Sequence, residues 1–102
     1  MIRGSEDLFA RTNRAALNNS TAVVRRLLPN GKVHGHEYIA LNPRRGDERL
    51  GSFKVNVVTG RWADFATGDA GGDLISLAAY LFGMSQIEAA RRLADMLGVS
   101  HG

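Results

Sequence analysis

The chain has 102 residues, of which 44% are hydrophobic and 23% charged, and it contains no cysteine. This size and apolar content fit one small globular domain, and the lack of cysteine excludes disulfides, Cys-ligated metals and a thiol nucleophile. The net charge is +3, but residues 1–61 carry 11 basic and 5 acidic side chains, whereas residues 62–102 carry 2 and 5. This asymmetry favours a basic surface for an acidic partner such as nucleic acid.

No apolar run approaches the roughly 20 residues that a membrane-spanning helix needs. The first seven residues also lack the apolar core of a secretory signal. We therefore expect a soluble, cytoplasmic protein that makes no membrane contact.

The N-terminal third has a helical pattern. Ser5-Glu6-Asp7 is typical of a helix start, and apolar residues follow at helical spacing as far as Leu17. Ser20 marks either a kink or a new cap, and the second apolar stripe ends at Pro29-Asn30-Gly31. Residues 1–35 are therefore expected to form an N-terminal helical extension.

The middle third has the period of strands. Residues 36–42 form a short strand candidate, and residues 42–51 have the composition of a charged loop. Phe53, Val55 and Val57 alternate with polar residues, and after a turn at Thr59-Gly60 the segment 61–65 returns as the partner strand. This pattern predicts a hairpin plus one further strand.

The last third is helical. Asp73 is a candidate N-cap for a helix that stops at Gly83, and Ser85 with Glu88 resembles a capping box for a helix that ends at Gly98. The fold class is therefore α+β: a small antiparallel sheet with an N-terminal helix and two C-terminal helices. Residues 36–98 and the extension are expected to form one compact domain, with residues 99–102 as a tail.

Catalytic patterns are sparse. No serine lies in a nucleophile-elbow context, so we expect no enzymatic activity from this chain alone. His34 and His36 are either a pair of metal ligands or solvated imidazoles. Three carboxylates near the start of the C-terminal third either hold Mg²⁺ or act as turn and cap residues: Asp64, Asp69 and Asp73. Gly71-Gly72 is either a phosphate cradle or a tight strand-to-helix connection.

Basic and aromatic residues are interleaved in the loop and the hairpin. Charges that follow phosphates and rings that stack on bases are the chemistry of single-stranded nucleic-acid binding. The candidate residues for this binding are Arg44, Arg45, Arg49, Lys54, Arg61 and Trp62. Trp62 is either such a stacking ring, together with Tyr38, or a core residue along with Phe65, and the sequence leaves both readings open.

One series of segments resembles a known family. The segments are Gly51-Ser52-Phe53, Arg61-Trp62-Ala63-Asp64-Phe65 and Gly71-Gly72-Asp73-Leu74-Ile75. Their order and spacing resemble those of the N-terminal zinc-ribbon domain of bacterial and phage DNA primases. The helix that begins at Ser85 also resembles that family. The resemblance covers roughly residues 38–97, and it implies a module that binds single-stranded template while a separate domain makes the phosphodiester bond.

This sequence departs from the family at its zinc ligands. The resemblance places the four metal positions on Asn42, Arg45, Asp64 and Thr67, none of which is cysteine or histidine. We therefore expect no metal and no cofactor. A salt bridge from Arg45 or Arg44 to Asp64, together with hydrogen bonds, is expected to replace the metal. Zinc-less versions of this kind occur in primase–helicases of phages and mobile elements.

Two functions from different classes remain. The first is non-catalytic binding of single-stranded DNA in primase or primase–helicase replication of a phage or mobile element. The alternative is a small protein that reuses this scaffold as a protein-interaction or inhibitory module, with a primase, a helicase or another protein as its partner. An acidic patch or an exposed apolar stripe on the C-terminal helices would favour the alternative.

Overall fold

The computed structural model describes residues 4–44 and 51–100, with the side chains of residues 4–7 excluded. It confirms the α+β class, including the N-terminal helix and the two C-terminal helices. The helices and strands are, in chain order, α1 (Gly4–Asn18), α2 (Ser20–Leu27), β1 (Lys32–His34), β2 (Glu37–Ala40), β3 (Phe53–Asn56), β4 (Trp62–Asp64), β5 (Ala70–Gly71), α3 (Leu74–Phe82) and α4 (Gln86–Leu97).

The sheet is an antiparallel meander with the strand order β1-β2-β3-β4-β5. The predicted hairpin and additional strand correspond to β2, β3 and β4. The two edge strands were not predicted. All three residues of β1 are exposed, and β5 has only two residues, so neither strand shows the apolar alternation that identifies a half-buried strand.

The N-terminal extension is integrated into the rest of the molecule. Its helical part is broken at Asn19, and the Ser20 hydroxyl donates to the Val57 carbonyl oxygen at 2.6 Å, which ties the start of α2 to the turn after β3. The predicted boundary after residue 35 falls in the turn between β1 and β2. Residues 1–35 thus contribute a strand as well as helices, and α1 packs on α4 and α3.

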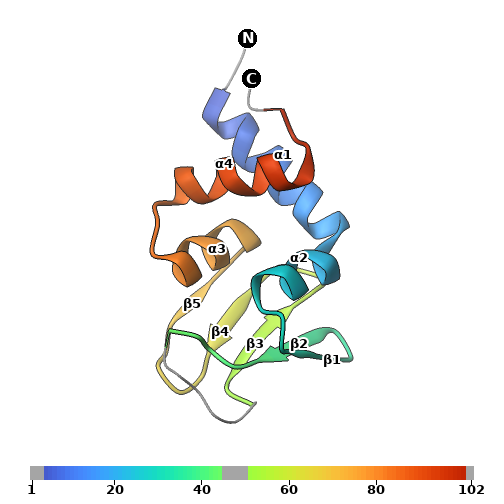
Figure 1. Cartoon of the computed structure of the whole chain (residues 1–102), viewed down its shortest axis with the longest axis vertical. Helices are drawn as coiled ribbons and strands as arrows, with labels where there is room; N and C mark the ends of the chain where they lie inside the picture. Colours follow the sequence, from blue (N-terminus) through green and yellow to red (C-terminus); the bar gives the residue numbers. More distant parts are fainter. Residues whose placement is uncertain (1–3, 45–50, 101–102) are drawn as a thin grey trace.

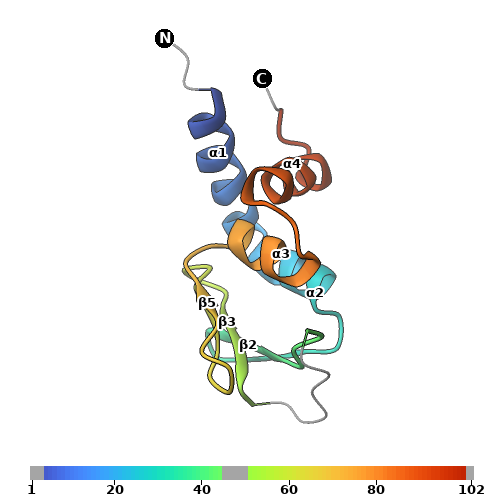
Figure 2. The ribbon, with the colours of Figure 1, turned by 90° about the vertical axis from the view of Figure 1, so that its left-hand side faces the viewer.

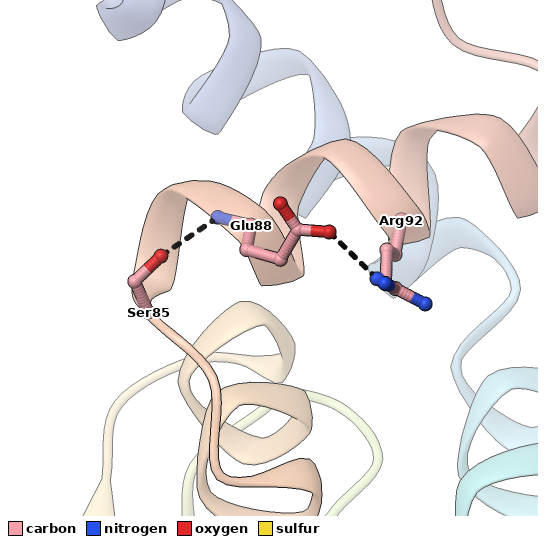
Figure 3. Close-up of polar contacts among 3 residues, drawn as sticks. All are labelled: Ser85, Glu88 and Arg92. Atoms are coloured by element: carbon pink, nitrogen blue, oxygen red, sulfur yellow. Dashed lines mark hydrogen bonds and ion pairs between the residues drawn. The ribbon is translucent and has the colours of Figure 1, made fainter.

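The C-terminal helices begin and end where the sequence predicts. The Asp73 carboxylate accepts from the Ser76 amide at 2.8 Å, and Gly83 ends α3 in the left-handed conformation. The Ser85 hydroxyl accepts from the Glu88 amide at 3.2 Å (Figure 3). The Glu88 carboxylate does not complete the predicted capping box, because it accepts from Arg92 Nε at 2.8 Å instead (Figure 3).

The core lies between one face of the sheet and the helices. In both views α1 and α4 lie farthest from the strands, and α2 and α3 lie closer to the sheet (Figure 1 and Figure 2). Tyr38, Phe53, Val55 and Trp62 point from the sheet into this core. None of the helices in the described ranges is both long and apolar enough to span a lipid bilayer.

Candidate functional site

The register divides the sheet into a covered face and an open face. Cross-strand partners place Lys32, Ile39, Lys54, Ala63 and Ala70 in one row across all five strands. The neighbouring row, again in sheet order, contains His34, Glu37, Asn56 and Arg61. These rows alternate with the buried row, so they lie on the face away from the core. We call these two rows and Phe65, which follows β4, the open face.

Phe65 is the exposed aromatic residue of the open face. It keeps 71% of its surface exposed, and the Lys54 ammonium lies 5.9 Å from the ring centroid. Lys54 Nζ also lies 3.8 Å from Glu37 Oε1. Beside this pair is a shallow hollow of about 290 Å³, to which Asn56 and Arg61 contribute. The open face therefore combines an aromatic ring, basic side chains and a concave surface.

Trp62 borders the hollow of the open face, but its side chain points into the core. It is 5% exposed, its ring lies 4.8 Å from the ring of Tyr80, and its Nε1–H donates to Ser76 Oγ at 2.9 Å. The prediction of Trp62 as a stacking residue is therefore wrong, and its reading as a core residue is right. Tyr38 is fully buried as well. Strand alternation directs Trp62 into the core and Phe65 toward solvent. Trp62 therefore cannot stack on a base, and Phe65 is not a core residue.

Gly71 contributes to the burial of Trp62. A Cβ atom on Gly71 would overlap both Trp62 Nε1 and Ser76 Oγ, since it would come closer to them than packed atoms approach. Gly71 therefore allows the β5 backbone to pass beside the indole. This close approach supports the reading of Gly71-Gly72 as a tight strand-to-helix connection.

The predicted group of basic residues is divided by the fold. Lys54 and Arg61 lie on the open face, where Lys32 joins them. Arg44 lies on the helix side of the sheet, because its Nη1 donates to the Tyr80 carbonyl oxygen at 3.0 Å and its guanidinium lies 5.4 Å from the Tyr80 ring centroid. Arg45 and Arg49 lie outside the described residues. Sequence reasoning missed Lys32 because no strand was predicted there, and it missed Phe65 because it assigned that ring to the core.

A buried polar cluster occupies the region that corresponds to the zinc site in the resemblance. Asn42 and Asp64 are both fully buried, and Asn42 Nδ2 donates to Asp64 Oδ2 at 2.7 Å and to the Tyr80 hydroxyl at 2.9 Å. The Tyr80 hydroxyl in turn donates to Asp69 Oδ2 at 2.9 Å. Asp64 Oδ1 accepts from the Ala66 amide at 2.8 Å. Hydrogen bonds thus connect the end of β2, the turn after β4 and α3.

The interactions in this cluster differ in part from the prediction. Arg44 bonds to Tyr80 and does not form the predicted salt bridge with Asp64, and the proposed role of Arg45 lies outside the described residues. Thr67, the last of the four predicted positions, is exposed, and its hydroxyl donates to Asp69 at 3.1 Å. Within residues 4–44 and 51–100, no group of three or more histidine, aspartate or glutamate side chains is arranged to hold a metal ion.

His34 and His36 do not lie on one strand. His34 ends β1, Gly35 has a positive φ of 64°, and His36 follows it in the turn. Both imidazoles are exposed. This geometry favours their reading as solvated side chains at a hairpin turn.

The Tyr80 hydroxyl connects the cluster to its charged neighbours. Burial raises the pKa of the Tyr80 phenol above its usual value, and the carboxylates of Asp69 and Asp64 raise it further, whereas the hydrogen bond from Asn42 acts in the opposite direction. A phenolate at this position would also lose its donor hydrogen bond to Asp69. The folded state therefore holds the phenol proton more tightly than the unfolded state does.

This shift predicts a loss of stability at alkaline pH. The contribution of Tyr80 is complete below the unfolded-state pKa of about 10, and it is lost as the pH rises through the higher folded-state pKa. We expect the free energy of unfolding of the wild type to fall more steeply above about pH 10 than that of Tyr80→Phe. Urea denaturation across this range measures both slopes. Equal slopes would show that Tyr80 makes no such contribution.

No model of a known protein family matches the chain, and no curated protein does. The chain is an α+β protein whose antiparallel sheet has one core face and one open face, with a buried polar cluster at one end.

Proposed function

We propose that the chain is a non-catalytic module that binds single-stranded nucleic acid on the open face of its sheet. The observation that carries this proposal is the exposed Phe65 ring with the Lys54 ammonium beside it. The exposed Phe65 ring is accessible to a ligand, and a nucleobase is a flat ligand that a phenyl ring can stack against.

The surrounding charges fit a phosphate backbone. Lys32, Lys54 and Arg61 provide three cations on the open face, against one carboxylate from Glu37. Neither Lys32 nor Arg61 forms an ion pair with another described residue, so both side chains are available to phosphates. A single strand exposes bases and phosphates together, whereas a duplex conceals the faces of its bases from a stacking ring.

The resemblance to primase zinc ribbons supports single-stranded DNA as the ligand. In those domains the corresponding region contacts the template, while polymerisation belongs to a separate domain. We therefore place the chain in the cytoplasm, in template binding for the primase or primase–helicase of a phage or mobile element. In this proposal the bonds around Asn42 and Asp64 perform the structural task that zinc performs in that family.

The proposal is tested by titrating labelled single-stranded oligonucleotides at several salt concentrations. Lys54→Ala and Arg61→Ala are each expected to weaken binding to a similar degree for all sequences. Each is also expected to reduce the slope of log affinity against log salt by about 0.7 for every phosphate that the protein no longer neutralises. Fluorescence anisotropy measures both quantities.

Two arginines provide internal controls. Arg91→Ala, an exposed position on α4, is expected to leave both affinity and salt slope close to the wild-type values. Arg44→Ala is expected to have a smaller effect than Lys54→Ala, because its guanidinium is held against Tyr80. Equal losses from Arg91→Ala and Lys54→Ala would show that charge acts without a localised site. Wild-type binding too weak to measure at low salt would rule the proposal out.

A further inference from the structure

A second surface lies among the helices, separate from the open face. It is a groove of about 340 Å³ between α2, α3 and α4. Its apolar lining includes the small buried residues Ala78 and Ala89 and the larger side chains of Leu27, Phe82 and Leu93. Phe82 keeps 58% of its surface exposed. An exposed apolar surface on the C-terminal helices favours the protein-interaction alternative, and Phe82 is the exposed apolar residue that these helices contribute to the groove.

The groove continues beyond Phe82. A neighbouring hollow of about 460 Å³ shares Leu27 and Phe82 with it and extends to Pro43. The two hollows thus form one apolar surface with Phe82 at its centre. Met84 and Met96, which line the first hollow, are half-buried and have flexible side chains that adapt to different apolar partners.

Two arginines border the groove. Arg26 on α2 and Arg92 on α4 both line it, and both are exposed. Arg26 forms no ion pair with another described residue. Glu88 accepts from Arg92 Nε and orients the guanidinium, which leaves the Arg92 Nη atoms without a partner among the described residues (Figure 3). The rim is therefore basic, although Glu88 offsets part of the charge of Arg92, and it is complementary to carboxylates.

The walls also determine the backbone conformation of an occupant. The groove is lined mainly by helices, whose inner N–H and C=O groups bond within each helix. An extended peptide would find few backbone partners there, whereas a helix satisfies its own backbone groups. We propose that this groove binds an amphipathic helix of a partner protein, with apolar residues facing Phe82 and acidic residues facing Arg26 and Arg92.

The test uses the full chain and two synthetic peptides of about 18 residues. Both peptides carry leucines at i, i+3, i+4 and i+7, with glutamates beside this stripe in one peptide and lysines in the other. In titrations of the ¹⁵N-labelled protein, the glutamate peptide is expected to cause saturable shifts at the amides of Leu27, Phe82 and Leu93. The lysine peptide is expected to bind at least about tenfold more weakly.

Matched variants separate the groove from general charge. The double variant Arg26→Glu/Arg92→Glu is expected to weaken binding of the glutamate peptide by about tenfold or more and to favour the lysine peptide. Its control, Arg25→Glu/Arg91→Glu, makes the same charge change on the same helices at exposed positions outside the groove. This control is expected to alter affinity by less than about twofold. Phe82→Ser is expected to abolish the shifts, and thermal melts verify that every variant folds.

Four results would overturn the inference. Equal binding of the two peptides, or equal losses in the two double variants, would show that the rim does not select acidic residues. Shifts confined to the open face would place the peptide elsewhere. If the wild type self-associates in sedimentation experiments and Phe82→Ser abolishes this association, the occupant of the groove is a second copy of the chain. Oligonucleotide binding at the open face is measured independently, so its success or failure does not decide this test.

Discussion

Trp62→Ala is expected to lower the free energy of unfolding by about 3–5 kcal/mol, the usual cost of removing a large buried aromatic side chain. The variant loses the ring contacts with Phe53 and Tyr80, and it leaves the Ser76 hydroxyl without its indole donor. Chemical denaturation measures the loss. Ligand binding is judged only in a variant that remains folded. Trp62→Phe keeps an aromatic ring, so its oligonucleotide affinity is measured alongside the stability of Trp62→Ala.

Phe65→Ala, in the same hairpin, is expected to affect ligand binding and to leave stability almost unchanged. Because the ring is 71% exposed, the free energy of unfolding is expected to change by less than about 1 kcal/mol. Affinity for a single-stranded oligonucleotide is expected to fall by about tenfold, as the loss of one stacked base implies, with little change in salt slope. Loss of DNA affinity in a folded Trp62→Phe, with none in Phe65→Ala, would contradict this assignment of roles.

Asp64→Asn is expected to destabilise the protein by about 1–3 kcal/mol, although the side chain keeps its size. Both carboxylate oxygens accept hydrogen bonds, Oδ2 from Asn42 and Oδ1 from the Ala66 amide. An amide group in this position directs an N–H toward one of these two donors. Since the site is fully buried, water cannot compensate for the lost bond.

Exchanging the two side chains tests whether the pair acts as a unit. The variant Asn42→Asp/Asp64→Asn restores one donor and one acceptor, and it is expected to be more stable than the less stable of the two single variants. Thr67→Ala is the control at an exposed position of the same turn, with an expected change within about 0.5 kcal/mol. If Asp64→Asn also remained within about 0.5 kcal/mol of wild type, the cluster would have no structural importance.

The candidate site was partly predictable. The resemblance brought Asn42 and Asp64 together although 22 residues separate them, and the structure places their side chains in contact. It did not predict that Asn42 and the Ala66 amide donate to Asp64. Arg44 was expected at Asp64, yet the Tyr80 ring and carbonyl group attract the guanidinium to α3. Such a choice depends on which helix covers the end of the sheet, and this information is absent from local spacing.

The local features follow from the amino-acid sequence. Asp73 and Ser85 cap helices, Gly83 ends α3, and the alternation in β3 directs Phe53 and Val55 into the core, because each of these outcomes depends on neighbours in the chain. Which face of the β3–β4 hairpin the helices cover depends on tertiary packing, and this packing buries Trp62 and leaves Phe65 exposed. It also brings Arg26 and Arg92 to one groove. Packing between distant segments decides these outcomes. The arrangement that buries the most apolar surface over the whole fold is favoured, and this total cannot be judged from one strand.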